Sequence, residues 1–147
     1  MAPIVESVEI SKPPQEVFAY LDDLARHGEW QGQIVEVVSV SDGPTRVGSR
    51  ATDKRRVPGG MREVTYEIVE HDPPRRTRFH GIDGPIRPVG TVTVEPLDEG
   101  SRSRVTLELD FEGHGIGKLL LPLVRGNVRK QVPQDQARLK ERLEAGV

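Results

Sequence analysis

The sequence contains no cysteine, so disulfide bonds, thiolate zinc sites and a cysteine nucleophile are all excluded. It also lacks an excess of charge of either sign, because 21 basic residues stand against 23 acidic ones for a formal net charge of -2. Such a balance provides no overall field to attract a polyanion. We therefore expect no nucleic-acid partner.

Long hydrophobic runs are missing as well. The longest apolar run, LLLPLV at residues 119–124, is far shorter than the roughly 20 residues that span a bilayer. The opening residues MAPIVESVEI lack the basic and apolar regions of a signal peptide. We expect no transmembrane segment and, by default, a cytoplasmic location.

The residues that are present fit one folded domain. The chain has 147 residues, of which 35% are hydrophobic and 30% are charged, as in an ordinary globular protein. Its 12 prolines and 15 glycines are spread along the chain as turn signals rather than gathered in low-complexity stretches. We expect a single domain over residues 1–147.

The N-terminal part begins with a strand pattern and continues with a helix pattern. Residues Ile4–Ile10 alternate apolar and polar side chains, as a half-buried strand requires. The next stretch, KPPQEVFAYLDD, predicts a short helix, because its prolines fit a first turn and Val17, Phe18 and Leu21 share one face. A second short turn then leads to Trp30, the only tryptophan in the chain.

The middle of the chain has the two-residue period of strands. Turn signals recur between the apolar segments, namely SDGPT, PGG, HDPPR, IDGP and LDEG. Such short links predict an antiparallel meander. The expected strands are Ile34–Val40, Val47–Arg56, Met61–Glu70, Arg75–Ile82, Arg87–Glu95 and Arg102–Phe111.

The C-terminal part has a helical period. Its apolar stripe predicts one long helix that ends before Gly146. Pro122 and Pro133 interrupt it, and an interior proline costs roughly 3 kcal/mol in a straight helix. We therefore expect a bent helix. The stripe consists of Ile116, Leu120, Val124, Val128 and Val132, widened by Leu119, Leu123, Leu139 and Leu143.

One large helix has to cover one long antiparallel sheet, so the sheet is expected to curl around it in an α+β fold. Apolar parity assigns the side chains of the inner face. These are Val64, Tyr66, Ile68, Thr77, Phe79, Val92, Val94, Val105, Leu107, Leu109 and Phe111.

Five stretches carry a resemblance to a known family: VEISKPPQEVFAYLDDLARHGEW, VGSRATDKRRVPGG, VTYEIVEHDPPRRTRF, SRVTLELDFEG and QARLKERLEAG. Over essentially its whole length the chain resembles the polyketide cyclase/dehydrase and lipid transport family of the START-like (SRPBCC) superfamily. The resemblance implies a helix-grip fold, in which a seven-stranded curled antiparallel sheet surrounds a long C-terminal helix, with two short helices after strand one. These stretches are patterns of strand, proline and helix, so they are specific for fold and not for activity.

In similar proteins the space between sheet and helix is a hydrophobic cavity for lipids, sterols or polyketides. The composition agrees, because three Phe, two Tyr and one Trp, with small inner residues such as Ser49, leave the interior hard to fill. The alternative is that the helix packs down and closes the space. The predicted ligand-binding residues are Trp30, Ala51, Asp53, Tyr66, Phe79, Val92, Leu107, Leu109, Leu120 and Val124.

The roles of some of these residues stay open. Trp30 either plugs the end of the core or forms a cavity wall on which a ligand stacks. Asp53 and Arg55 either anchor the polar group of a ligand or form a solvated salt bridge at the end of a hairpin. Tyr66 is a further anchor, since a buried phenol usually has a hydrogen-bond partner.

No set of residues indicates a particular reaction. The chain has no GxSxG, Walker-type or GxGxxG motif. Its four histidines lack the spacing of metal ligands, so we expect no metal and no other cofactor. His71 and His80 are expected at the surface, whereas His114, in the link EGHGIG, could reach the mouth of the cavity.

Basic residues gather near two hairpin ends and along the last helix. The first groups, Lys54, Arg55, Arg56 and Arg62, then Arg75, Arg76 and Arg78, are typical of solvated strand edges, with an anionic headgroup or an acidic partner as the alternative. Arg125, Arg129 and Lys130 are expected on the outer face of the helix.

The leading hypothesis is a protein that binds a small hydrophobic molecule between the sheet and the C-terminal helix. The alternative is a polyketide cyclase or aromatase, for which Asp53, Tyr66 and His114 are the first candidates as acid or base. A protein-interaction module is a third alternative. Whether the chain is an enzyme stays open at this point, as does a homodimer.

Overall fold

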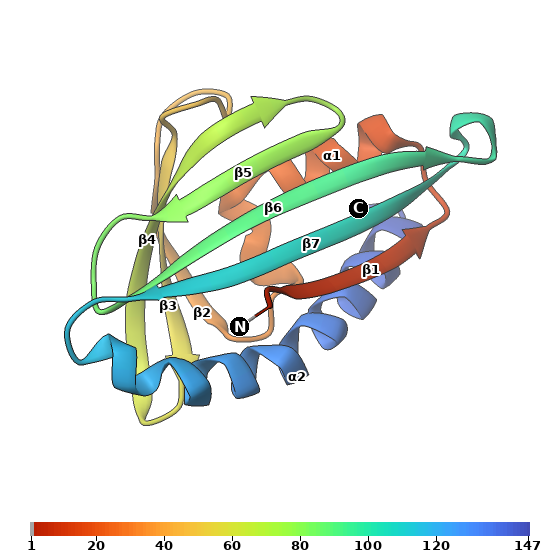
Figure 1. Cartoon of the computed structure of the whole chain (residues 1–147). Helices are drawn as coiled ribbons and strands as arrows, with labels where there is room; N and C mark the ends of the chain where they lie inside the picture. The colour runs from red at the N-terminus through yellow and green to blue at the C-terminus, as the bar shows by residue number, and fades with distance from the viewer. Residues whose placement is uncertain (1) are drawn as a thin grey trace.

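The computed structural model describes residues 2–147 and places seven antiparallel strands in one sheet that curls around a long helix (Figure 1). The strands lie in the order β1-β7-β6-β5-β4-β3-β2. The α+β helix-grip architecture expected from the sequence is confirmed. In chain order the elements are β1 Ile4–Ile10, α1 Pro14–Asp22, the 3-10 helix η1 Leu24–Glu29, β2 Ile34–Val40, β3 Arg50–Val57, β4 Gly60–Asp72, β5 Arg76–Gly81, β6 Ile86–Leu97, the 3-10 turn η2 Asp98–Gly100, β7 Arg102–Gly113 and α2 Gly117–Glu144.

The third strand begins later than the sequence pattern predicts. Val47 was expected to start it, but β3 starts at Arg50, because residues 46–49 form a turn closed by a hydrogen bond from the Ser49 amide to the Arg46 carbonyl (3.0 Å). Gly48 has a φ of +93°, a value that side-chain-bearing residues rarely adopt. Val47 is therefore an exposed turn residue.

The inner face of the sheet follows the parity expected from the sequence. Tyr66, Ile68, Val94, Val105 and Leu109 are all buried on it. Strand pairing keeps this parity across the sheet, because Val92 lies opposite Leu107 and Val94 lies opposite Val105 in the β6–β7 ladder. The apolar side chains consequently face α2 and α1.

One glycine in the sheet makes room for an aromatic ring. Gly90 pairs with Phe79 across β5 and β6, and a Cβ atom at Gly90 would clash with the Phe79 ring. The ring of Phe79 can therefore lie close over the β6 backbone. It makes an edge contact with the ring of Tyr66, with the ring centroids 5.7 Å apart.

The two short helices cover one end of the curled sheet. Val17, Phe18 and Leu21 of α1 are buried in the main core cluster, together with Leu139 and Leu143 at the far end of α2. Pro14 lies in the first turn of α1, where its missing amide proton costs nothing. This end of the molecule is thus closed by packed apolar side chains.

The long helix α2 bends along its length (Figure 1). Pro122 and Pro133 lie inside it, as the sequence predicts. Gln136 donates to the Glu6 carbonyl of β1 (2.9 Å) and so fixes the second half of the helix to the sheet edge. Among residues 2–147, no helix is both long and apolar enough to cross a membrane.

Arg125 lies inside the structure, which corrects the expectation that it belongs to the outer face of the helix. Its side chain is buried and pairs with Asp110 of β7. The stripe on α2 that faces the sheet is therefore wider than its apolar residues indicate. Arg129 and Lys130, by contrast, are exposed as expected.

Candidate functional site

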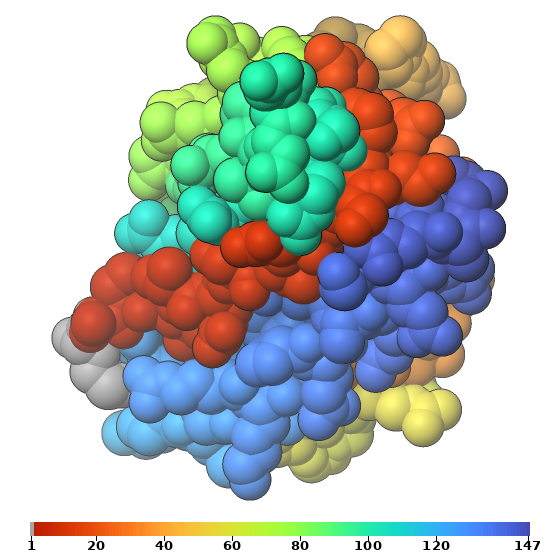
Figure 2. Space-filling view, turned by 90° about the vertical axis from the view of Figure 1, so that its right-hand side faces the viewer, coloured from red at the N-terminus to blue at the C-terminus, as the bar shows by residue number. Residues whose placement is uncertain are grey.

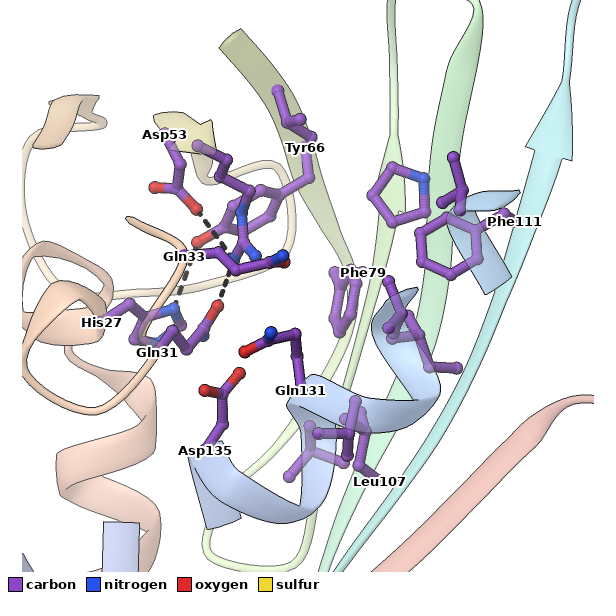
Figure 3. A pocket seen from close by; sticks show the side chains of 18 of the residues that line it. His27, Gln31, Gln33, Asp53, Tyr66, Phe79, Leu107, Phe111, Gln131 and Asp135 are labelled. Atoms are coloured by element: carbon purple, nitrogen blue, oxygen red, sulfur yellow. Dashed lines mark hydrogen bonds and ion pairs between the residues drawn. The ribbon is translucent and has the colours of Figure 1, made fainter. Parts of the chain in front are cut away.

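A cavity of about 250 Å³ lies between the inner face of the sheet and α2. Most of its lining is apolar and comes from β3 to β7 and from α2. Figure 3 shows a division between its two sides, with apolar Phe79, Leu107 and Phe111 on one side. The other side carries polar residues, namely His27, Gln31, Gln33, Asp53, Tyr66, Gln131 and Asp135.

Asp53 is the most deeply buried polar group of the cavity, with 1% of its surface exposed. The alternation of β3 directs its side chain inward, next to that of Arg55 two residues later. Its Oδ2 atom lies 3.6 Å from Nη2 of Arg55, whereas its Oδ1 atom has no hydrogen-bond partner among residues 2–147. Burial raises the pKa of Asp53, and the positive charge of Arg55 partly opposes that rise.

Arg55 connects this carboxyl group to the loop before β2. Its Nη2 atom donates a hydrogen bond to the side-chain oxygen of Gln31, in addition to its ion pair with Asp53. The side chain of Arg55 is 25% exposed, so it is neither free in solvent nor fully enclosed. Arg55 is therefore held at the cavity wall by two partners.

His27 lies beside these groups and is held as a neutral imidazole. Its Nε2 atom is 2.7 Å from the carbonyl oxygen of Leu21, and because a carbonyl only accepts, Nε2 carries the proton. The unprotonated Nδ1 atom then faces the hydroxyl group of Tyr66 at 3.5 Å and accepts from it. Burial lowers the pKa of His27 and raises the pKa of Tyr66, so both groups stay uncharged near neutral pH.

Trp30 lies between the core and the cavity. Its ring packs against the main core cluster and also lines the cavity. It meets the His27 ring edge-on, with the ring centroids 5.3 Å apart. Its Nε1 atom is buried without a hydrogen-bond partner among residues 2–147. Trp30 therefore adds an unused donor near the polar side of the cavity.

The helix contributes polar residues to the same side. Asp135 accepts hydrogen bonds from the Gly32 amide and from Nη1 of Arg138, each at 3.0 Å, and so ties α2 to the loop before β2. Burial raises the pKa of Asp135. Gln131, one turn earlier, points into the cavity toward Gln31 and Gln33 (Figure 3). Hydrogen-bonding groups thus converge from the sheet, the loop and the helix.

The structure brings together all of the predicted ligand-binding residues except one. Those that line the cavity are Trp30, Asp53, Tyr66, Phe79, Val92, Leu107, Leu109, Leu120 and Val124. Ala51 does not line it. The residue is 1% exposed and packs in a cluster with the larger side chains of Leu24, Tyr66 and Ile68.

Two histidines lie elsewhere than expected. His114 is 46% exposed and lies 3.6 Å from Glu112, outside the residues that line the cavity, so the expectation that it reaches the mouth is wrong. His71 was expected at the surface but is only 13% exposed, because it pairs with Asp22 at the end of α1 (2.9 Å). Among residues 2–147, no group of acidic or histidine side chains gathers closely enough to hold a metal ion.

Sequence reasoning missed several polar residues of the site. Gln131 and Asp135 follow Val124 and Val128 at the spacing of one helix face. Their position in this otherwise apolar stripe could have predicted that they line the cavity. His27 gave no such signal, because it lies in a 3-10 helix of six residues with no periodic pattern.

Comparison with known proteins places the chain in a family and agrees with its fold. A family model described as polyketide cyclase/dehydrase and lipid transport matches residues 1–144. An uncharacterised protein of Mycobacterium tuberculosis (strain H37Rv) is 26% identical over 139 residues, which cover 91% of this chain and 96% of that protein.

Solved structures share the fold over nearly the whole chain. A protein from Thermus thermophilus is 25% identical with a TM-score of 0.79, covering 99% of both chains. An aromatase/cyclase from Streptomyces sp. R1128 is 15% identical with a TM-score of 0.81, covering 97% of this chain and 93% of its own. A START superfamily protein from Mycobacterium smegmatis is 11% identical with a TM-score of 0.74, covering 97% and 99%.

Proposed function

The chain belongs to the polyketide cyclase/dehydrase and lipid transport family, and we propose that it binds a small hydrophobic molecule with one polar end in the cavity between the sheet and α2. The observation that carries the proposal is the division of this cavity. Apolar side chains form one side, and on the other the buried carboxylate of Asp53 has an oxygen without a partner among residues 2–147. A ligand with one polar end fits both sides at once.

The polar side is needed for affinity. A molecule that buries roughly 200 Å² of apolar surface gains about 5 kcal/mol, whereas the loss of its free motion costs at least about 4 kcal/mol. Apolar contact alone therefore gives weak binding. Hydrogen bonds to Asp53, Arg55 and Tyr66 supply the remaining affinity and fix the orientation of the ligand.

The size of the cavity favours a small ligand. Its volume of about 250 Å³ is slightly below the roughly 300–1,000 Å³ of sites for drug-sized molecules. A molecule of one or two rings, or a short acyl chain, fits this space better than a sterol does. Of the ligand types expected from the sequence, a small polyketide-like molecule or a short-chain lipid is therefore favoured.

A second function, that of a cyclase or aromatase acting on a poly-β-ketone, is favoured by the pair formed by His27 and Tyr66. The hydroxyl group of Tyr66 donates to Nδ1 of the neutral His27, so His27 can take up the phenol proton as the Tyr66 oxygen removes a proton from a carbon next to a carbonyl group. Arg55 would stabilise the enolate oxygen that forms. If turnover of such a substrate is found and His27→Gln leaves it unchanged, this second function is discarded.

A protein-interaction module would be favoured by an α2 that closes onto the sheet. Such closed packing is not present, because a cavity of about 250 Å³ lies between α2 and the sheet. Ligand binding in the cavity is therefore the function that the geometry supports best.

The fluorescence of Trp30 tests ligand binding, because it is the only tryptophan and lines the cavity. Short-chain alcohols, which do not absorb in the tryptophan band and can donate a hydrogen bond to Asp53, are titrated into the protein. We expect a saturable change that Val124→Phe abolishes, because the larger ring fills the cavity from α2. Val47→Phe, at an exposed turn outside the cavity, is the matched control and should bind as the unaltered protein does.

A further inference from the structure

The mouth of the cavity is bordered by large apolar side chains that are exposed. On the first half of α2, Ile116 is 69% exposed, Leu119 81% and Leu123 56%. Met61 at the tip of the β3–β4 hairpin is 55% exposed and lies on the face of the hairpin opposite that of Arg62, which lines the cavity. Isolated exposed apolar residues need no explanation, but a group of them around one opening indicates an interaction surface.

Basic residues accompany these apolar side chains, and the acidic residues Glu36 and Glu63 lie opposite Lys54 on the two strands beside it. Residues 54–62 contain Lys54, Arg55, Arg56 and Arg62, and residues 113–134 contain Lys118, Arg125, Arg129 and Lys130, whereas neither stretch contains Asp or Glu. The chain as a whole carries a formal net charge of -2, so these two stretches are more basic than the rest of the chain. Within residues 2–147, only Arg55 and Arg125 of these eight pair with a carboxylate.

The two stretches lie side by side as the two lips of the cavity. Figures 1 and 2 both show the first half of α2, in light blue, next to the yellow β3–β4 hairpin. The same cavity is lined by Pro58 and Arg62 from the hairpin and by Leu120 and Leu123 from the helix. Lys130 follows Leu123 by seven residues and therefore lies on the same exposed face of α2. We call this surface, formed by residues 54–62 and 116–130, the mouth surface.

We propose that the mouth surface docks on an anionic lipid bilayer. Exposed leucine, isoleucine and methionine side chains enter the boundary between headgroups and acyl chains, while the lysines and arginines beside them meet the negative headgroups. A second copy of this chain suits the surface less well, because a symmetric contact would place its basic residues against those of the partner. Docking in this orientation turns the opening of the cavity toward the lipid phase, from which an apolar ligand can enter.

Vesicle co-sedimentation tests the proposal with the full chain. The protein is mixed with phosphatidylcholine vesicles with and without phosphatidylserine, and the bound fraction is measured. We expect binding that requires phosphatidylserine and weakens with added salt. Each basic residue near such a surface contributes about fivefold in the binding constant, so the Lys118→Glu, Lys130→Glu double variant should bind at least about 25-fold more weakly.

Apolar and charged variants each have a matched control. The Ile116→Ser, Leu119→Ser double variant removes side chains that do not line the cavity, so it tests docking without changing the ligand site. Its control is Val47→Ser, which removes an exposed apolar side chain at the opposite end of β3 from the hairpin. The control for charge is Lys12→Glu, near the C-terminal end of α2.

Two results would overturn the proposal. One is the absence of binding to vesicles that contain phosphatidylserine. The other is an equal loss of binding in the control variants and in the mouth-surface variants. A change of oligomeric state in the Ile116→Ser, Leu119→Ser variant, without vesicle binding by the unaltered protein, would assign the surface to contact between copies of the chain. Ligand binding by the same variants is measured separately, by titrating them with the short-chain alcohols and following Trp30 fluorescence. A loss of vesicle binding with unchanged ligand binding then affects only the docking proposal.

Discussion

The Nδ1 atom of His27 lies 3.5 Å from the hydroxyl oxygen of Tyr66, although the two residues are 39 positions apart in the chain. The short helix η1 brings His27 to the inner face of β4, and the Leu21 carbonyl fixes which nitrogen is protonated. The cavity therefore holds an uncharged hydrogen-bonding pair beside the Asp53–Arg55 ion pair.

Stability should fall as the pH is lowered through the titration of His27. Burial lowers the pKa of His27 below its ordinary value of 6.5, so the unfolded chain takes up a proton before the folded chain does. Its contribution to stability is thus complete above pH 6.5 and is lost as the pH falls below that value. As the pH falls from neutral to the pKa of His27 in the folded state, we expect the His27→Gln variant to lose less stability than the unaltered protein. Urea unfolding at several pH values measures this, with His80→Gln, near the surface, as the control.

Removing the hydroxyl group of Tyr66 should destabilise the protein modestly. In Tyr66→Phe the Nδ1 atom of His27 loses its partner, which typically costs about 1 kcal/mol. The bond is long, so a larger loss is not expected. Chemical denaturation measures the difference. An equal or higher free energy of unfolding in Tyr66→Phe would show that the contact contributes no stability.

Asp53→Asn should separate ligand binding from folding. Burial raises the pKa of Asp53, so above its ordinary value of 3.8 the folded state loses stability as the carboxyl group ionises with rising pH. Asparagine removes that loss but also removes the ion pair with Arg55. Because these two effects oppose each other, at neutral pH we expect the free energy of unfolding to change by less than about 1 kcal/mol.

Ligand affinity should respond differently to the same change. Because the free oxygen of Asp53 is proposed to accept from the polar end of the ligand, we expect affinity in Asp53→Asn to fall by about tenfold or more. Titration of both proteins with the same ligand measures this. Glu63→Gln, an exposed carboxyl on the neighbouring strand, should leave affinity unchanged, and equal affinity in Asp53→Asn would remove Asp53 from the site.

The pair formed by Arg125 and Asp110 should stabilise the docking of α2 on β7. Arg125 is 7% exposed and Asp110 is partly exposed, so solvent weakens the pair only in part. We expect Arg125→Ala to lower the free energy of unfolding by about 1–2 kcal/mol. The control is Arg129→Ala, at an exposed position without an ion pair among residues 2–147, which should change it by less than about 0.5 kcal/mol. Thermal unfolding compares the two, and equal losses would contradict this role of the pair.

Most of the fold could be predicted from the sequence because the signals for its turns and strands are local. Glycine and proline mark the turns between the strands, and the two-residue period assigns the inner residues such as Tyr66 and Phe79. The start of β3 could not be placed in the same way, because Val47 fits a strand pattern while Gly48 forms a turn with positive φ. Local pattern alone does not decide between these two.

The sequence predicted those site residues whose position follows from the strand or helix period. It did not predict those whose position depends on tertiary contacts. Parity predicts that Asp53 faces inward, and the helix period predicts Leu120 and Val124. His27 comes from a segment without a period, and Ala51 has the right parity but packs among larger side chains. The buried position of Arg125 could not be predicted from the helix period either, because it depends on the ion pair with Asp110 of β7.

Native mass spectrometry of the purified protein tests the central claim most directly, as isolated and after exposure to a pool of lipids, sterols and aromatic polyketides. We expect a saturable one-to-one adduct with a small member of the pool, and its loss in Val124→Phe but not in Val47→Phe. Absence of an adduct with every class, or an adduct that Val124→Phe leaves intact, would contradict ligand binding in the cavity.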